Sequence, residues 1–67
     1  MISVILNGQK TEVRSGITLN QLIHDLGLDS KWVVAELNGN ALVKIDYDRT
    51  FISNGDRIEL VRAVSGG

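Results

Sequence analysis

The sequence contains no cysteine, no proline, one histidine and only three aromatic residues: one tryptophan, one tyrosine and one phenylalanine. Without cysteine the chain has no disulfide, no thiolate nucleophile and no thiolate ligand for zinc. A metal site built from histidines is not expected either, because His24 is alone. Stability must therefore come from regular packing, and the absence of cysteine is compatible with a reducing cytosol.

The sequence also lacks a basic cluster and a long apolar run. The net charge is −1 and the isoelectric point is near 5.6, which together with the scarcity of aromatic residues argues against nucleic-acid binding. The longest apolar run is "WVVA" at 32–35, far too short to span a bilayer, and the first residues do not follow a signal-peptide pattern. We therefore expect a cytoplasmic protein that binds neither nucleic acid nor membrane.

Apolar and polar residues alternate over several short stretches, which is the period of a strand. The dipeptides Asn7-Gly8 and Asn38-Gly39 each separate two such stretches, and Asn-Gly is the strongest short signal for a hairpin. Residues 46–52 have no clean period, so we expect them to cross the sheet as a turn or a single helical turn. The predicted strands cover residues 2–7, 9–13, 31–38, 41–45 and 57–64.

The segment 18–26 carries the signals of an amphipathic helix with defined ends. Thr18 is the expected N-cap, and Gln21 three residues later completes a capping box. Gly27 suits the left-handed position after the last turn, and Leu28 can then reach back to the helix as in a Schellman motif. One face is apolar at the helical period, which predicts that this face packs on a sheet. Its residues are Leu19, Leu22, Ile23 and Leu26.

These elements predict an α+β fold in which a mixed sheet of four to five strands packs on one helix, the β-grasp arrangement. The first and last strands are the most apolar, so we expect them side by side in the centre, with the polar strands at the edges. Residues 1–67 should form a single domain with a thin core, because a chain of this size buries only about 60% of its surface. The predicted core residues are Ile2, Val4, Leu6, Leu19, Leu22, Ile23, Leu26, Ala35, Leu37, Ile58 and Leu60.

No set of residues in the sequence has the complementary roles that a catalytic site needs. The serines have His24 as their one possible partner, and His24 falls on the polar face of the predicted helix, where we interpret it as an exposed residue without a role. Asp46 and Asp48 flank Tyr47, but the other oxygen ligands of a calcium loop are absent. The sequence therefore predicts no catalytic residue, no metal site and no bound cofactor, hence no enzyme.

The chain ends with "VRAVSGG", in which the residues become smaller toward the terminus. We expect a flexible tail at about 63–67 that reaches roughly 10–14 Å beyond the last strand. Its one reactive group is the α-carboxylate of Gly67. Glycine suits this place because a chain without Cβ can pass through a narrow channel in a partner. The alternative is a disordered terminus without a role, as at most chain ends.

The segments "NGDRIELVRAVSGG" (54–67) and "VVAELNGN" (33–40) make the sequence similar to the ThiS family, the ubiquitin-like sulfur carriers of thiamine biosynthesis. The resemblance implies that a ThiF-like adenylating enzyme uses ATP and magnesium to convert Gly67 into an acyl-adenylate. A persulfide derived from a cysteine desulfurase then yields a thiocarboxylate. The tail, with Gly66, Ser65 and Val64, would carry that sulfur into a ThiG-like thiazole synthase.

The face of the sheet turned away from the helix is the expected docking surface for these enzymes. Alternation places Ile5 and Val61 on that face, and Arg62 and Ala63 lie next to the root of the tail. Arg62 would add a contact to an acidic partner surface.

Other functions fit the same sequence. A sulfur carrier for molybdopterin synthase would use the same chemistry with a different acceptor. A ubiquitin-like protein modifier would join Gly67 to a lysine through an isopeptide bond. A β-grasp binding module without carrier function would be indifferent to deletion of the tail.

Overall fold

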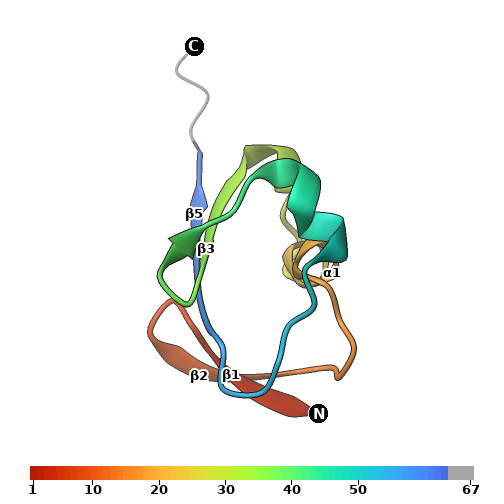
Figure 1. Ribbon diagram of the computed structural model, residues 1–67, viewed down its shortest axis with the longest axis vertical. Coiled ribbons are helices and arrows are strands. Elements are labelled where there is room, and N and C mark those ends of the chain that lie inside the picture. Colours follow the sequence, from red (N-terminus) through yellow and green to blue (C-terminus); the bar gives the residue numbers. More distant parts are fainter. Residues whose placement is uncertain (64–67) are drawn as a thin grey trace.

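The computed structural model describes residues 1–63; the residues expected to form the rest of the tail, 64–67, lie outside the described part. A five-stranded sheet curves around one α-helix, as Figure 1 shows. The elements along the chain are β1 (Ile2–Leu6), β2 (Gln9–Val13), α1 (Leu19–Asp25), η1 (Ser30–Trp32), β3 (Val33–Leu37), β4 (Asn40–Ala41), η2 (Lys44–Arg49) and β5 (Arg57–Arg62), where η denotes a 3₁₀ helix.

The strands lie in the order β2-β1-β5-β3-β4, so the first and last strands are neighbours in the centre. β1 and β5 are parallel, whereas the other three neighbouring pairs are antiparallel. The mixed sheet and the central position of its two most apolar strands are as predicted. The polar strands β2 and β4 form the edges, where polar side chains protect a sheet from pairing with another chain.

Helix α1 begins and ends as the sequence predicts. The Thr18 hydroxyl accepts from the backbone N–H of Gln21 at 3.1 Å, and the Gln21 side chain accepts from the backbone N–H of Thr18 at 2.9 Å, which completes the capping box. At the other end, Gly27 has a φ of 78° and Leu28 N–H donates to Ile23 carbonyl oxygen, as in a Schellman motif. Within residues 1–63 no helix is long and apolar enough to cross a membrane.

The core lies between α1 and the sheet. Leu26 was predicted to be buried there, and this is wrong: its exposed fraction is 44%. Helix α1 ends at Asp25, so Leu26 is the C-cap and lies beyond the last helical residue. Of the other residues predicted to be buried, Ile2, Leu6 and Leu37 are half-buried against the core. The buried apolar residues are Val4, Val13, Ile17, Leu19, Leu22, Ile23, Val33, Ala35, Tyr47, Ile52, Ile58 and Leu60.

The chain departs from the prediction after the second hairpin. A strand was expected over 41–45, but β4 stops at Ala41 and the 3₁₀ helix η2 occupies Lys44–Arg49. Residues 46–49 of η2 lie in the segment predicted to form a turn or a single helical turn, and this part of the prediction is confirmed. Tyr47 anchors η2 to the sheet, because its ring is buried and its hydroxyl donates to Val33 carbonyl oxygen at 2.8 Å.

We expect Tyr47→Phe to lower the free energy of unfolding by about 1 kcal/mol, because one buried hydrogen bond is lost. The loss stays modest because Val33 carbonyl oxygen also accepts from Lys44 Nζ, at 3.2 Å. Urea unfolding followed by circular dichroism measures it. Tyr47→Leu removes part of the ring as well and should cost more, since it leaves a cavity. A Phe variant as stable as the parent protein would show that the hydroxyl does not hold η2 to β3.

Candidate functional site

Strand β5 brings the C-terminal part of the chain through the centre of the sheet and ends at Arg62. Directly after it, Ala63 N–H donates to Trp32 carbonyl oxygen at 2.6 Å. The sequence placed the start of the tail at about this residue, but the hydrogen bond holds Ala63 beside the start of β3. The point at which the chain leaves the sheet, which we call the tail root, is therefore fixed by main-chain contacts.

The residues predicted to enter a partner are Val64, Ser65, Gly66 and Gly67, and all of them lie outside the described residues. Their roles, including modification of Gly67, stay predictions. What the structure does define is the surface around the tail root, from which these residues continue.

The sheet face turned away from α1 carries an apolar pair near the tail root. Val61 on β5 lies opposite Val34 on β3, and their exposed fractions are 61% and 48%. Ile5, also predicted for the partner interface, is 36% exposed and lies beside Arg57, at the other end of β5. The register therefore brings Val61 together with Val34 and leaves Ile5 apart from them.

Two carboxylates separate these apolar positions. Glu36 lies directly opposite Glu59 between the Val34–Val61 pair and the level of Ile5, and both side chains are exposed. Like charges in such a cross-strand position destabilise a sheet. Alternation alone could not show this interruption, because it depends on how β3 and β5 are aligned.

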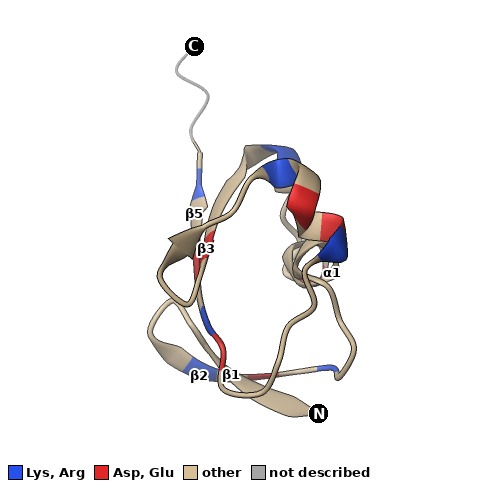
Figure 2. Cartoon of the chain, in the orientation of Figure 1, with Lys and Arg blue, Asp and Glu red and all other residues tan. Residues whose placement is uncertain are grey.

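The other predicted interface residue, Arg62, belongs to the opposite side of the sheet. Arg62 pairs with Val33, whose side chain is buried toward α1, and paired residues share a side. Lys44 approaches the same place from η2 and donates from Nζ to Val33 carbonyl oxygen. Figure 2 shows a blue segment at the upper end of β5 and another on the helical ribbon at the top of the view. No sequence pattern pointed to Lys44, because its position depends on η2.

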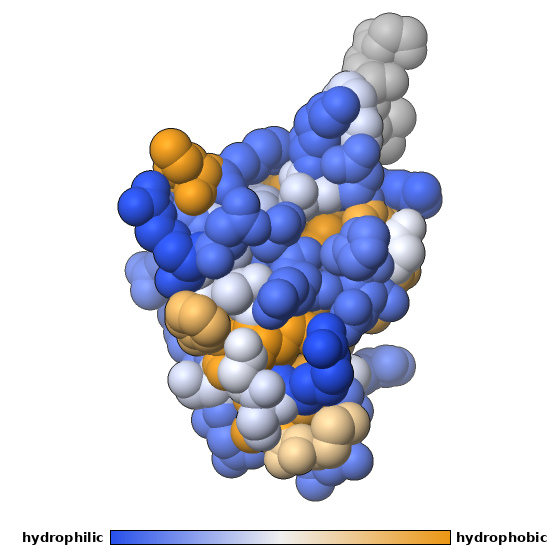
Figure 3. Space-filling view, turned by 90° about the vertical axis from the view of Figure 1, so that its right-hand side faces the viewer, coloured by the Kyte–Doolittle hydropathy of each residue, from blue (hydrophilic) through white to orange (hydrophobic). Residues whose placement is uncertain are grey.

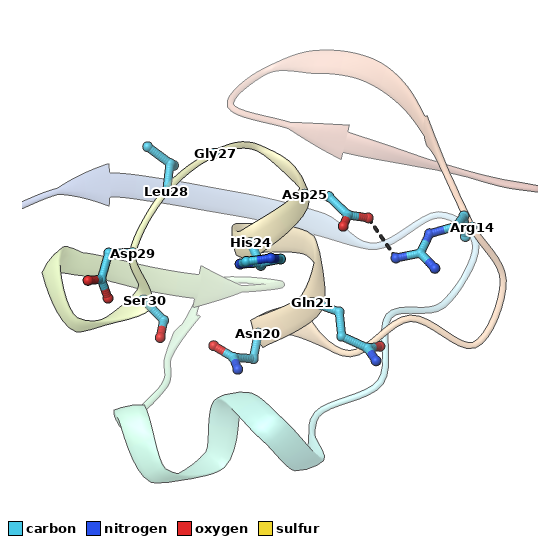
Figure 4. Close-up of a pocket in the computed structure, with 9 residues that line it drawn as sticks. All are labelled: Arg14, Asn20, Gln21, His24, Asp25, Gly27, Leu28, Asp29 and Ser30. Carbon is cyan, nitrogen blue, oxygen red and sulfur yellow. Dashed lines mark hydrogen bonds and ion pairs between the residues drawn. The ribbon is translucent and has the colours of Figure 1, made fainter.

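A polar depression on the helix side surrounds His24 (Figure 4). Arg14 and Asp25 in it form an ion pair at 2.7 Å, with both side chains largely exposed. His24 is exposed, as predicted, and no nucleophile and base meet there. Among residues 1–63, no three His, Cys, Asp or Glu side chains gather in a group that could hold a metal ion.

Apolar side chains on the helix side of the molecule do not form one large patch. In Figure 3 they occur as small areas separated by polar side chains. Scattered apolar residues of this kind are common on soluble proteins and need no functional explanation. The tail root is therefore the one place in the described chain where an exposed apolar pair, two cations and the exit of the chain coincide.

Comparisons with known proteins identify the family of the chain. The sequence model of the ThiS family matches residues 4–67. The chain is 29% identical over 66 residues to a thiazole synthase from Paramagnetospirillum magneticum, which covers 98% of this chain but only 20% of that protein, about a fifth of its length. It is 34% identical over 62 residues to the uncharacterized protein ycf40 of Trieres chinensis, covering 92% of this chain and 85% of that one.

A solved structure has the same fold. The crystal structure of the thiamine biosynthesis protein ThiS from Geobacter metallireducens superposes with a TM-score of 0.84 at 26% identity, covering 98% of this chain and 100% of the other. The solution structure of a thiamine biosynthesis protein from the same organism gives a TM-score of 0.82. With the family match over nearly its whole length, the chain belongs to the ThiS family, the small carrier proteins of thiamine biosynthesis.

Proposed function

We propose that this protein carries sulfur as a thiocarboxylate on Gly67 and delivers it to a thiazole synthase. The observation that carries the proposal is the family match, which runs from residue 4 through both final glycines. The likeness of the fold to the crystal structure of ThiS from Geobacter metallireducens also supports it.

The chemistry requires a free α-carboxylate on Gly67. A carboxylate is a poor electrophile, so its oxygen first attacks the α-phosphorus of ATP in the adenylating enzyme and releases pyrophosphate. Magnesium in that enzyme offsets the phosphate charge. A persulfide sulfur then displaces AMP, and a thiol cleaves the resulting acyl disulfide to leave the thiocarboxylate on Gly67 and a disulfide on the donor.

The anchoring of Ala63 sets the working length of the carrier arm. Four residues follow it, and a fully extended chain of that length spans at most about 14 Å. The reacting carbon therefore lies within this distance of the tail root, so the partner must bind the folded body close to its active site. The absence of a side chain on residues 66 and 67 suits entry into a narrow channel.

The comparison with the thiazole synthase favours thiamine over molybdopterin as the pathway. A segment similar to this chain forms part of a protein of that name. A carrier and its acceptor enzyme that share one polypeptide are expected to act in one reaction sequence. Protein modification through Gly67 and a plain binding module have no comparable support.

The proposal is tested by pyrophosphate exchange. The adenylating enzyme, incubated with ATP and labelled pyrophosphate, should incorporate label into ATP only when this chain is added. A protein modifier would also support exchange, so the second step is thiazole formation in a mixture with thiazole synthase. Absence of exchange, or exchange without any support of thiazole formation, would contradict the proposal.

We expect Val61→Asp to weaken binding to the adenylating enzyme by roughly tenfold or more, because it places a charge in the apolar pair that a docked partner would cover. The fold should persist, since Val61 is 61% exposed. Phe51→Asp is the matched control: Phe51 is 62% exposed but pairs with Thr18 on the helix side. Equal affinities of the two variants, measured by calorimetry, would place the docking surface elsewhere.

A further inference from the structure

We propose that Lys44 and Arg62 form a two-cation collar at the tail root that binds carboxylates of the partner protein beside the channel entered by the tail. This inference rests on the proposed function, and it adds a second contact surface, on the helix side of the sheet, with a partner of stated charge. The partner therefore contacts the end of the molecule from both sides: the apolar pair on the open face and the collar on the helix side.

The side chain of Lys44 is held by a hydrogen bond to the main chain of β3. Its Nζ donates to Val33 carbonyl oxygen at 3.2 Å and lies 5.9 Å from the centroid of the Tyr47 ring. The Tyr47 hydroxyl donates to the same carbonyl oxygen, so a second hydrogen bond joins η2 to the start of β3 beside the lysine. The ammonium group therefore has a defined position at the end of the sheet, although the residue as a whole is exposed.

Arg62 lies across the sheet from that position. It pairs with Val33 in the β3–β5 register and is exposed, and Ala63 after it bonds to Trp32. Lys44 and Arg62 thus both adjoin Val33, one from η2 and the other from β5.

Neither cation is neutralised by the described part of the protein. The ion pairs within residues 1–63 are Arg14–Asp25 and Arg49–Asp46, so Lys44 and Arg62 have no carboxylate within 4.0 Å there. The net charge of the chain is −1, so this positive end is local. An exposed positive patch on an otherwise slightly acidic protein favours a partner surface of opposite charge.

The distance from the reacting group indicates that the collar binds protein rather than nucleotide. Gly67 lies four residues beyond Ala63, and a fully extended arm of this length would place ATP at most about 14 Å from the tail root. The partner groups that face Lys44 and Arg62 are then protein groups around the entrance of the channel that receives the tail. Carboxylates there would orient the carrier and speed its association, which is what rim charges chiefly do.

Stopped-flow measurement of association with the adenylating enzyme tests the collar, with Trp32, the single tryptophan, as a reporter beside the tail root. Reversing both charges, Lys44→Glu with Arg62→Glu, should lower the association rate constant roughly tenfold or more at low ionic strength. The KM for ATP should stay unchanged. In about 1 M salt the difference should largely disappear, because the Debye length falls to about 3 Å.

Controls distinguish an effect of the collar on the association rate from an effect of net charge, from misfolding and from a failure of the proposed function. Lys10→Glu makes the same change of charge as Lys44→Glu alone, but on edge strand β2, opposite Ile5 and away from the tail root, and should leave the rate near that of the parent protein. The neutral variants Lys44→Gln and Arg62→Gln should each give a smaller decrease, with thermal unfolding verifying the fold. If the parent protein accepts sulfur while the collar variants associate as fast as Lys10→Glu, the collar is wrong and the carrier function stands. A parent protein that neither binds the enzyme nor accepts sulfur contradicts both.

Discussion

Deleting Gly67 is expected to abolish sulfur loading while leaving the fold of residues 1–63 unchanged. The deletion moves the terminal carboxylate back by about 3.5 Å, and a misplacement of even ~1 Å can lower a rate by about 100-fold. Gly66→Val should fail for a different reason, because a β-branched side chain restricts the backbone and widens the arm in a channel that admits glycine. One residue added after Gly67 replaces the carboxylate by an unreactive amide.

The measurement is the rate of loading for each variant with ATP, the adenylating enzyme and a persulfide source. Lys10→Glu is the control, since it changes edge strand β2 away from the tail root, and it should load close to the parent rate. Circular dichroism verifies that every variant folds. A chain lacking Gly67 that still acquires sulfur or supports thiazole formation would overturn the role assigned to the terminal glycine.

The second large effect concerns stability. Leu22→Ala is expected to lower the free energy of unfolding by about 2–5 kcal/mol, because Leu22 is 3% exposed in the layer between α1 and the sheet. A small domain has a total stability of the order of 5–15 kcal/mol, so the variant loses a large share of it.

Leu26→Ala is the control, because it makes the same substitution of leucine by alanine four residues further along the chain. Leu26 is 44% exposed at the C-cap, so the same truncation should cost well under half as much. Urea unfolding of the two variants gives the comparison. Similar losses at both positions would mean that the end of α1 packs more deeply than the structure shows.

The first half of the fold was predictable because its signals are local. Thr18, Gln21 and Gly27 each satisfy backbone groups within a few residues, so the sequence alone defines both ends of α1. The same holds for the Asn-Gly hairpins, in which Asn7 and Asn38 both have positive φ, as a type I′ turn needs.

The region after β4 was not predictable because its structure depends on a distant partner. Residues 46–49 of η2 lie in the segment predicted to form a turn or a single helical turn, but its start at Lys44 replaces the end of the strand predicted over 41–45, and Tyr47 in η2 bonds to Val33, fourteen positions earlier. The same distinction applies to the candidate site, where one part was predictable from the sequence and another needed the structure. The role of Gly67 is predicted from the sequence and the family resemblance and stays a prediction, whereas the grouping of Lys44 with Arg62 needs both η2 and the register of β3 with β5.

The mass of the intact protein after incubation with ATP, the adenylating enzyme and a persulfide source tests the carrier function most directly. The account predicts an ATP-dependent gain equal to the replacement of one oxygen by sulfur, which fragmentation localises to Gly67. A chain whose mass is unchanged under these conditions, or whose added sulfur lies on another residue, would contradict it.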